Sequence, residues 1–234
     1  MDKEYLNSIQ DYDRILKQRN RILQDAKFSR YKLTEKLEPW NIEFFQKAKE
    51  ITKKRKAFLV KLKETITPIH QELTAFLEPI DIYYKPSFSL DWLEYNDFSA
   101  NIQKYLNEEI LRGNTIIGPH RDEIVFLLNG YELRRFGSRG QHRSFLLALK
   151  IAVYRLLREH KKETPVFILD DVYSEIDSVR EKAFNDYFLD LGQVFITTHE
   201  KDIHFELPDD FKKEIKYIHI ENNYLMPEKE KMSS

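Results

Sequence analysis

The sequence contains no cysteine, which excludes disulfide bonds, thiol chemistry and cysteine-ligated zinc. No apolar run approaches the length that a membrane-spanning helix needs. The first residues, Met1-Asp2-Lys3-Glu4, have no apolar core of the kind that a signal peptide carries. These absences are compatible with a reducing cytoplasm, and we expect a cytoplasmic protein with no membrane partner.

Glycine is scarce, and the positions of the glycines exclude one common nucleotide-binding loop. A loop that cradles nucleotide phosphates needs the pattern G-x-x-x-x-G-K-[ST] between a strand and a helix. None of the 6 glycines begins that pattern. The sequence therefore does not encode a complete site of this class.

Charged residues make up 33% of the chain, but the net charge is only −1, so the whole protein is not a polycation. Residues 1–70 contain 17 Lys/Arg and 10 Asp/Glu, a net charge of +7, which leaves −8 for the remainder. A basic arm on an acidic body fits a nucleic-acid contact, and it also fits a solvated helical face. The candidate DNA-binding residues are the consecutive cations Lys53, Lys54, Arg55 and Lys56, which ordinary surface charge explains as well.

Residues 1–112 predict a helical arm or lid domain. Apolar residues recur at spacings of three and four over residues 5–26, with Arg19 at one position of the stripe. This pattern predicts an amphipathic helix, which we expect to continue through residues 27–36.

A turn is expected at residues 38–41, where Asn41 is a candidate N-cap. A second helix is expected over residues 42–65 or beyond, so that the two long helices form an antiparallel hairpin. Alternating β-forming residues predict a strand over 80–86, and a further helix is expected over 98–111.

Residues 113–234 predict an α/β domain with a mostly parallel sheet, because short apolar strands alternate with helical segments. Asn129-Gly130 between two apolar runs is a strong hairpin signal. The expected elements are strands at 124–128 and 131–133, a helix at 145–158, a strand at 166–169, a helix at 178–189, a strand before His199 and a hairpin at 217–224.

Two aspartates, Asp170 and Asp171, follow the apolar strand at 166–169. Ligands bind outside the carboxyl ends of strands in open α/β sheets, and a carboxylate pair there suits Mg²⁺. The interpretation of the aspartates as caps of the next helix stays open.

Two further loops carry chemistry suited to phosphate. Residues 136–144 open an apolar helix, whose glycines allow close approach and whose N-terminus offers free N–H groups to an anion. Residues 193–200 repeat the design of a strand that runs into hydroxyls and ends at His199, which also fits a partly buried histidine bonded to a neighbouring strand. The three loops together are more specific than any one of them.

In this order the motifs resemble those of ABC-type ATPases. Residues 137–141 resemble the signature loop, residues 169–171 the Walker B motif, residues 174–177 the D-loop and His199 the switch histidine. The residues of these motifs most closely resemble those of the RecF family of recombination mediators. Further stretches that resemble this family are Gln18-Arg19-Asn20, residues 118–123 and residues 136–143.

The resemblance implies a partial P-loop ATPase head (residues 113–234) with a helical arm, and it implies roles for single residues. Asp170 would hold Mg²⁺ directly or through a water, Asp171 would orient or deprotonate the attacking water, and His199 would sense the γ-phosphate. The residues implied to meet ATP held by a second subunit are Ser138, Arg139, Gly140 and Gln141, and those implied to line the dimer interface are Ser174 and Asp177.

The family implies an ATP-dependent homodimer that binds DNA at single-strand/duplex junctions and helps RecO and RecR to load RecA at gaps. The phosphate loop of ABC-type ATPases lies N-terminal to the arm, so the chain resembles the C-terminal part of a RecF-like protein. We expect the chain alone to bind ATP poorly and not to hydrolyse it at a useful rate. A truncated reading frame, a split protein completed by a separate chain and a stand-alone form would each explain this pattern.

Two alternatives remain open. In the first, the chain is a non-enzymatic module that binds a protein or DNA through its arm. In the second, it belongs to another ABC-type family, such as the SMC-like or overcoming-lysogenization-defect-like proteins.

Overall fold

The computed structural model describes residues 2–89, 95–161, 163–170, 187, 190–198, 215–221 and 224–226. The chain separates into two compact units, Met1–Pro165 and Val166–Ser234, and each is described by itself. The domain boundary expected at Arg112 stays a prediction. No described helix is both long enough and apolar enough to cross a membrane.

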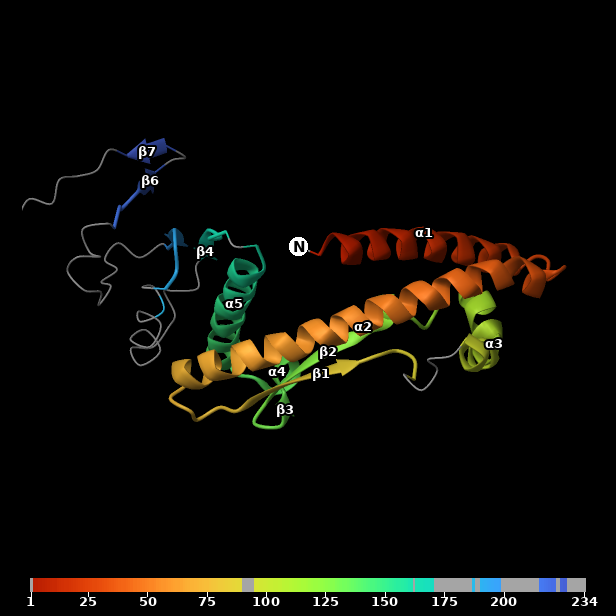
Figure 1. Ribbon diagram of the computed structural model, residues 1–234, viewed down its shortest axis with the longest axis horizontal. Coiled ribbons are helices and arrows are strands. Elements are labelled where there is room, and N and C mark those ends of the chain that lie inside the picture. Colours follow the sequence, from red (N-terminus) through yellow and green to blue (C-terminus); the bar gives the residue numbers. More distant parts are fainter. Residues whose placement is uncertain are drawn as a thin grey trace, which may run out of the picture. The chain divides into compact units, whose positions relative to one another are not determined.

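The first unit is dominated by two long helices, α1 (Lys3–Asp25) and α2 (Leu33–Leu73). Asp2 caps α1, because its carboxylate accepts the backbone N–H of Tyr5 at 3.0 Å. Figure 1 shows the two helices side by side and running in opposite directions.

The turn between α1 and α2 lies at residues 26–32, and its prediction at residues 38–41 is wrong. The prediction that the first helix continues through residues 27–36 is wrong as well. Pro39 lies inside α2, near its start, where the loss of one backbone hydrogen bond is offset by buried apolar contacts. Those contacts come from Leu33 and Leu37, which pack against Leu23 of α1.

The predicted N-cap Asn41 therefore lies within α2, and its buried side chain bonds to an arginine of α1 instead.

A small antiparallel sheet follows, in the order β1 (Ile80–Lys85), β2 (Glu123–Leu128) and β3 (Tyr131–Glu132). The strand predicted over 80–86 and the hairpin predicted at Asn129-Gly130 are confirmed. Both turn residues have positive φ, 52° and 80°, as a tight hairpin turn requires.

The remaining helices of the first unit are α3 (Tyr95–Arg112), the 3₁₀ turn η1 (Pro119–Arg121), α4 (Leu133–Phe136) and α5 (Arg139–Lys161). The helix predicted over 98–111 lies within α3, and the helix predicted over 145–158 lies within α5. Gly113 ends α3 with φ 70°, and its N–H bonds to the carbonyl of Glu109 at 2.7 Å.

One core cluster lies where α1, α2 and α3 meet. Its centre is a group of aromatic rings. The ring centroid of Phe98 in α3 lies 4.9 Å from that of Phe45 and 5.9 Å from that of Phe44, both in α2, and the rings are tilted against each other. Tyr12 of α1 completes the group at 5.3 Å from Phe44. This packing holds the segment at residues 114–118, which enters the same core at Ile117.

In the second unit, β4 (Phe167–Asp170) and β5 (Val194–Thr197) pair in parallel, with Asp170 opposite Thr197. The final hairpin predicted at 217–224 is confirmed by the antiparallel pair β6 (His219–Glu221) and β7 (Tyr224–Met226). The helix predicted over 178–189 lies outside the described residues, apart from Tyr187. The mostly parallel sheet stays a prediction beyond the pair β4–β5.

Candidate functional site

The signature-like residues form the start of α5. Ser138 precedes the helix, and its hydroxyl accepts the backbone N–H of Gln141 at 3.2 Å. The side-chain carbonyl of Gln141 reaches back and accepts the N–H of Ser138 at 2.9 Å. This reciprocal pair is a capping box, which fixes the first turn of α5.

The capping box leaves some donors of this turn uncommitted. Ser138 uses its oxygen as an acceptor, so its O–H hydrogen stays available as a donor, and the N–H groups of Arg139 and Gly140 have no intrahelical partner. Arg139 is exposed to solvent. The amide nitrogen of Gln141 already donates to Glu78 at 3.2 Å. The turn can therefore offer an anion one hydroxyl, two backbone N–H groups and one guanidinium.

Asp170 lies at the C-terminal end of β4, exposed to solvent, and accepts a short hydrogen bond from the hydroxyl of Thr197. The parallel pairing of β4 with β5 brings these two side chains together. A carboxylate oxygen and a hydroxyl at one strand edge suit a hard cation.

The other residues of the predicted site, Asp171, Ser174, Asp177 and His199, lie outside the described residues. Ser138 to Gln141 belong to the first unit and Asp170 to the second, so their convergence on one ligand stays a prediction. Within the described part of the chain, no three His, Asp or Glu side chains gather as a metal site.

The basic run on α2 divides into two exposed and two engaged cations. Lys53 and Lys56 are exposed. Arg55 donates to the hydroxyl of Tyr5 at 3.0 Å and to the carbonyl of Pro119 at 2.5 Å. Arg55 thereby ties α1 and η1 to α2, and its contact with DNA stays a prediction.

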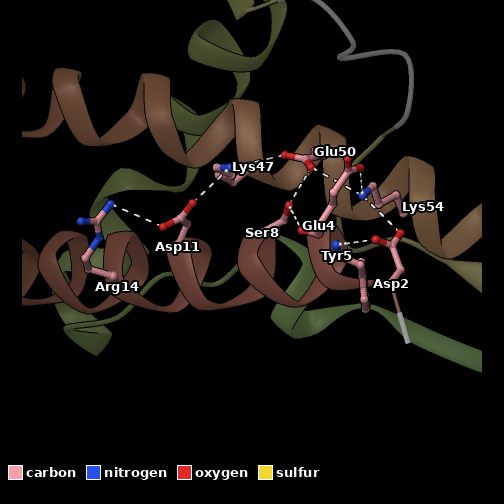
Figure 2. Close-up of polar contacts among 9 residues, drawn as sticks. All are labelled: Asp2, Glu4, Tyr5, Ser8, Asp11, Arg14, Lys47, Glu50 and Lys54. Atoms are coloured by element: carbon pink, nitrogen blue, oxygen red, sulfur yellow. Dashed lines mark hydrogen bonds and ion pairs between the residues drawn. The ribbon is translucent and has the colours of Figure 1, made fainter.

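Lys54 is engaged by carboxylates of α1. Figure 2 shows its ammonium between Asp2 and Glu4, at 3.2 and 3.1 Å. These contacts are part of a seam of polar side chains between α1 and α2, which continues to Glu50. Glu50 accepts a hydrogen bond from the hydroxyl of Ser8 at 2.6 Å. That bond lowers the pKa of the Glu50 carboxyl. The charge of the run available to a polyanion is therefore smaller than the sequence indicates.

Residues 118–123, which were noted above for their resemblance to the RecF family, take part in a polar network. His120 bonds through one ring nitrogen to the hydroxyl of Tyr12 at 2.7 Å and through the other to the carbonyl of Thr115 at 3.1 Å. A carbonyl only accepts, so Nε2 carries the proton and Nδ1 accepts from Tyr12. Partial burial lowers the pKa of His120, and deeper burial raises the pKa of Tyr12.

Asp122 completes this network with a side chain that is almost fully buried. It accepts the backbone N–H of Ser87 at 2.8 Å and a short hydrogen bond from the hydroxyl of Tyr84. Burial and the bond to Asp122 raise the pKa of Tyr84 to about 12. These contacts fix the start of β2 against β1.

Sequence reasoning missed a buried ion pair between Arg19 of α1 and Glu109 of α3. Their closest nitrogen and oxygen atoms are 2.6 Å apart, and the side chains are 1% and 0% exposed. Arg19 also donates to Asn41 at 2.9 Å and to Thr115 at 2.6 Å. The signal in the sequence was an arginine at an apolar stripe position.

Comparison with models of protein families finds no match. Among curated proteins, the chain is 36% identical over 182 residues to the DNA replication and repair protein RecF of Lachnospira eligens. It is 34% identical over 223 residues to the RecF protein of Bacillus cereus. These alignments include 77% and 93% of this chain, which spans 49% and 59% of the two relatives.

Solved structures of the recombination mediator protein RecF are also similar. One, described as RecF-ATP, matches with a TM-score of 0.74 and 28% identity over 87% of this chain and 55% of that chain. A second, described as RecF-ATPrS, matches with a TM-score of 0.75 at the same identity, over 88% and 56%. The two curated relatives and the two solved structures carry the same protein name.

Proposed function

Since the chain belongs to the RecF family, we propose that it acts in DNA replication and repair as the part of a RecF-like ATPase that holds the arm, the signature turn and the Walker B strand. It binds DNA at single-strand/duplex junctions and, with ATP, helps RecO and RecR to load RecA at gaps. The phosphate-binding loop lies outside the 234 residues of this sequence, because none of its glycines begins the required pattern.

One observation supports this proposal most directly. The exposed carboxylate of Asp170 and the hydroxyl of Thr197 meet at the ends of two parallel strands, where α/β proteins bind ligands. In the proposed complex, Asp170 holds Mg²⁺, Asp171 orients the attacking water and His199 contacts the γ-phosphate. When bound, Mg²⁺ supplies charge neutralisation on the phosphates.

The signature turn serves a second nucleotide in the proposed homodimer. Ser138 donates its hydroxyl hydrogen, Arg139 and Gly140 donate their N–H groups, and Gln141 keeps the turn in place through the capping box. Ser174 and Asp177 line the interface between the two copies. DNA is held through phosphate contacts, to which the exposed Lys53 and Lys56 contribute, so that affinity falls steeply with salt.

The experiment supplies the phosphate loop in trans. The chain is mixed with the separately produced N-terminal segment of the Bacillus cereus relative, and binding of a fluorescent ATP analogue is measured together with oligomeric state by light scattering. We expect weak binding by the chain alone and restored, Mg²⁺-dependent binding and dimerisation in the mixture. The variant Asp171→Asn keeps binding but loses hydrolysis.

Robust ATP turnover by the chain alone that depends on Asp171 would contradict the need for a second segment. No restored binding in the mixture favours the non-enzymatic module, in which the arm binds a partner and the ATPase remnant is only a scaffold. A matched control is Ser89→Ala, a serine outside the signature turn. It leaves the restored nucleotide binding unchanged, whereas Ser138→Ala weakens it.

A further inference from the structure

The turn between α1 and α2 carries two of the most exposed aromatic side chains in the described part of the chain. Phe28 is 92% exposed and Tyr31 is 70% exposed. Exposing two aromatic rings within four residues forgoes burial that would stabilise a fold. The turn, residues 26–32, lies at the end of the helical hairpin beside α3 (Figure 1).

The turn is nevertheless fixed in place. Arg30 donates to the side-chain carbonyl of Asn107 in α3 at 3.3 Å. The side chain of Lys27 lies over Gly113, where an added Cβ would come within 2.9 Å of its ammonium. The left-handed conformation of Lys32, with φ 51°, then redirects the chain into α2. The exposed rings are therefore presented by an anchored turn.

Cations alternate with these rings in the order Lys27, Phe28, Arg30, Tyr31, Lys32. Lys32 forms an ion pair with Glu35 at 3.3 Å and lies 5.8 Å from the ring of Tyr31. Lys27 and Arg30 form no ion pair with any residue that the structure describes. The side chain to which Arg30 donates, that of Asn107, is neutral.

We propose that residues 27–32, together called the arm tip, bind single-stranded DNA by stacking bases on Phe28 and Tyr31 while Lys27 and Arg30 contact the phosphates. Proteins that bind single strands combine aromatic platforms with cations along the backbone, and this recognition tolerates any sequence. A duplex offers phosphates but no free base faces, so the rings give the arm tip a preference for unpaired strands. This inference rests on the proposed function and places the single-stranded side of the junction at the arm tip.

The experiment measures the affinity of the full chain for a fluorescent oligothymidylate and for a duplex of equal length. We expect the double variant Phe28→Ala/Tyr31→Ala to weaken single-strand binding by about ten-fold for each ring removed. Duplex binding changes far less. Since both rings are exposed, the thermal midpoint of the variant stays that of the wild type.

The variant Lys27→Gln/Arg30→Gln tests the phosphate contacts. It lowers the slope of log affinity against log salt by about 0.7 for each lost contact on a single strand. Phe58→Ala is the matched control, because Phe58 is a half-exposed aromatic residue on α2, close in sequence to the basic run. Its removal leaves single-strand binding unchanged.

Single-strand binding that is insensitive to the Phe28 and Tyr31 changes overturns the arm-tip proposal and assigns these rings to a protein partner, while the proposed function stands. Absence of binding to either DNA by the wild type overturns both proposals. Loss of single-strand binding in Phe58→Ala instead places the site at the basic run.

Discussion

Two charged clusters join α1 to the rest of the first unit, and they differ in exposure. Arg19 and Glu109 are 1% and 0% exposed, whereas Lys54 is 25% exposed and its partner Glu4 is 86% exposed. Ionic contacts of similar length therefore lie in different dielectric surroundings. In the buried cluster, each charge depends on its partner because water is excluded, whereas water replaces a lost partner in the exposed cluster.

The largest expected effect comes from breaking the buried pair. Arg19→Met leaves the carboxylate of Glu109 buried without its cation, which destabilises the first unit by about 3–5 kcal/mol. Denaturant unfolding followed by circular dichroism measures the change. The double variant Arg19→Met/Glu109→Gln recovers part of the loss, because the amide oxygen still accepts the N–H of Ile116. A loss below about 1 kcal/mol for Arg19→Met would place this pair with the exposed cluster.

A steric version of the same comparison uses two glycines with positive φ. A Cβ at Gly118 would lie 2.4 Å from the hydroxyl of Tyr12 and 2.6 Å from the ring of Phe44, whereas nothing lies within 4 Å of a Cβ at Gly130. Gly118→Ala therefore combines backbone strain with a clash and costs about 3 kcal/mol or more. Gly130→Ala incurs only strain, about 1 kcal/mol. Equal thermal midpoints for the two variants would contradict this difference.

A smaller effect is expected on acidification, through His120. The folded-state pKa of His120 lies below the ordinary value of 6.5, so the unfolded chain binds more protons between these two pH values. Stability is therefore intact above about 6.5 and falls as the pH drops toward the folded-state pKa. Protonated Nδ1 can no longer accept from Tyr12.

The charged groups that face His120 are Arg19, Arg121 and Asp122, of which the two arginines lower its pKa and the aspartate raises it. The variant His120→Asn removes the titration, so its stability depends less on pH than that of the wild type in unfolding experiments between neutral and mildly acidic pH. Identical pH profiles for the two proteins would show that other groups cause the loss.

The sequence predicted local elements well where the signal was local. The strand at 80–86 follows from alternation, and the hairpin at Asn129-Gly130 follows from residues that tolerate positive φ. The turn after α1 was misplaced because Pro39 is a strong local signal, while the burial of Leu33 and Leu37 against α1 is a tertiary effect. Local propensity cannot report contacts between distant residues.

In the candidate site, too, features with a local signal follow from the sequence, whereas features that depend on exposure do not. The meeting of Asp170 with Thr197 follows from the rule that parallel strands end at one edge, and the capping box at Ser138 and Gln141 follows the S-x-x-Q pattern. The arm tip was missed because the sequence reports charge and aromaticity but not exposure. For the basic run, the sequence reports four cations but not that Lys54 and Arg55 already have partners within the chain.

The smallest expected effect on stability is that of the variant Lys54→Ala. Water solvates Asp2 and Glu4 once the ammonium is gone, because their side chains are already 49% and 86% exposed. The midpoint of thermal unfolding should stay within experimental error of the wild type, and added salt should not change that outcome. A clear loss of stability would mean that the seam drawn in Figure 2 behaves as a network rather than as separate surface pairs. Lys54 would then belong with Arg19, and exposure alone would not distinguish the two clusters.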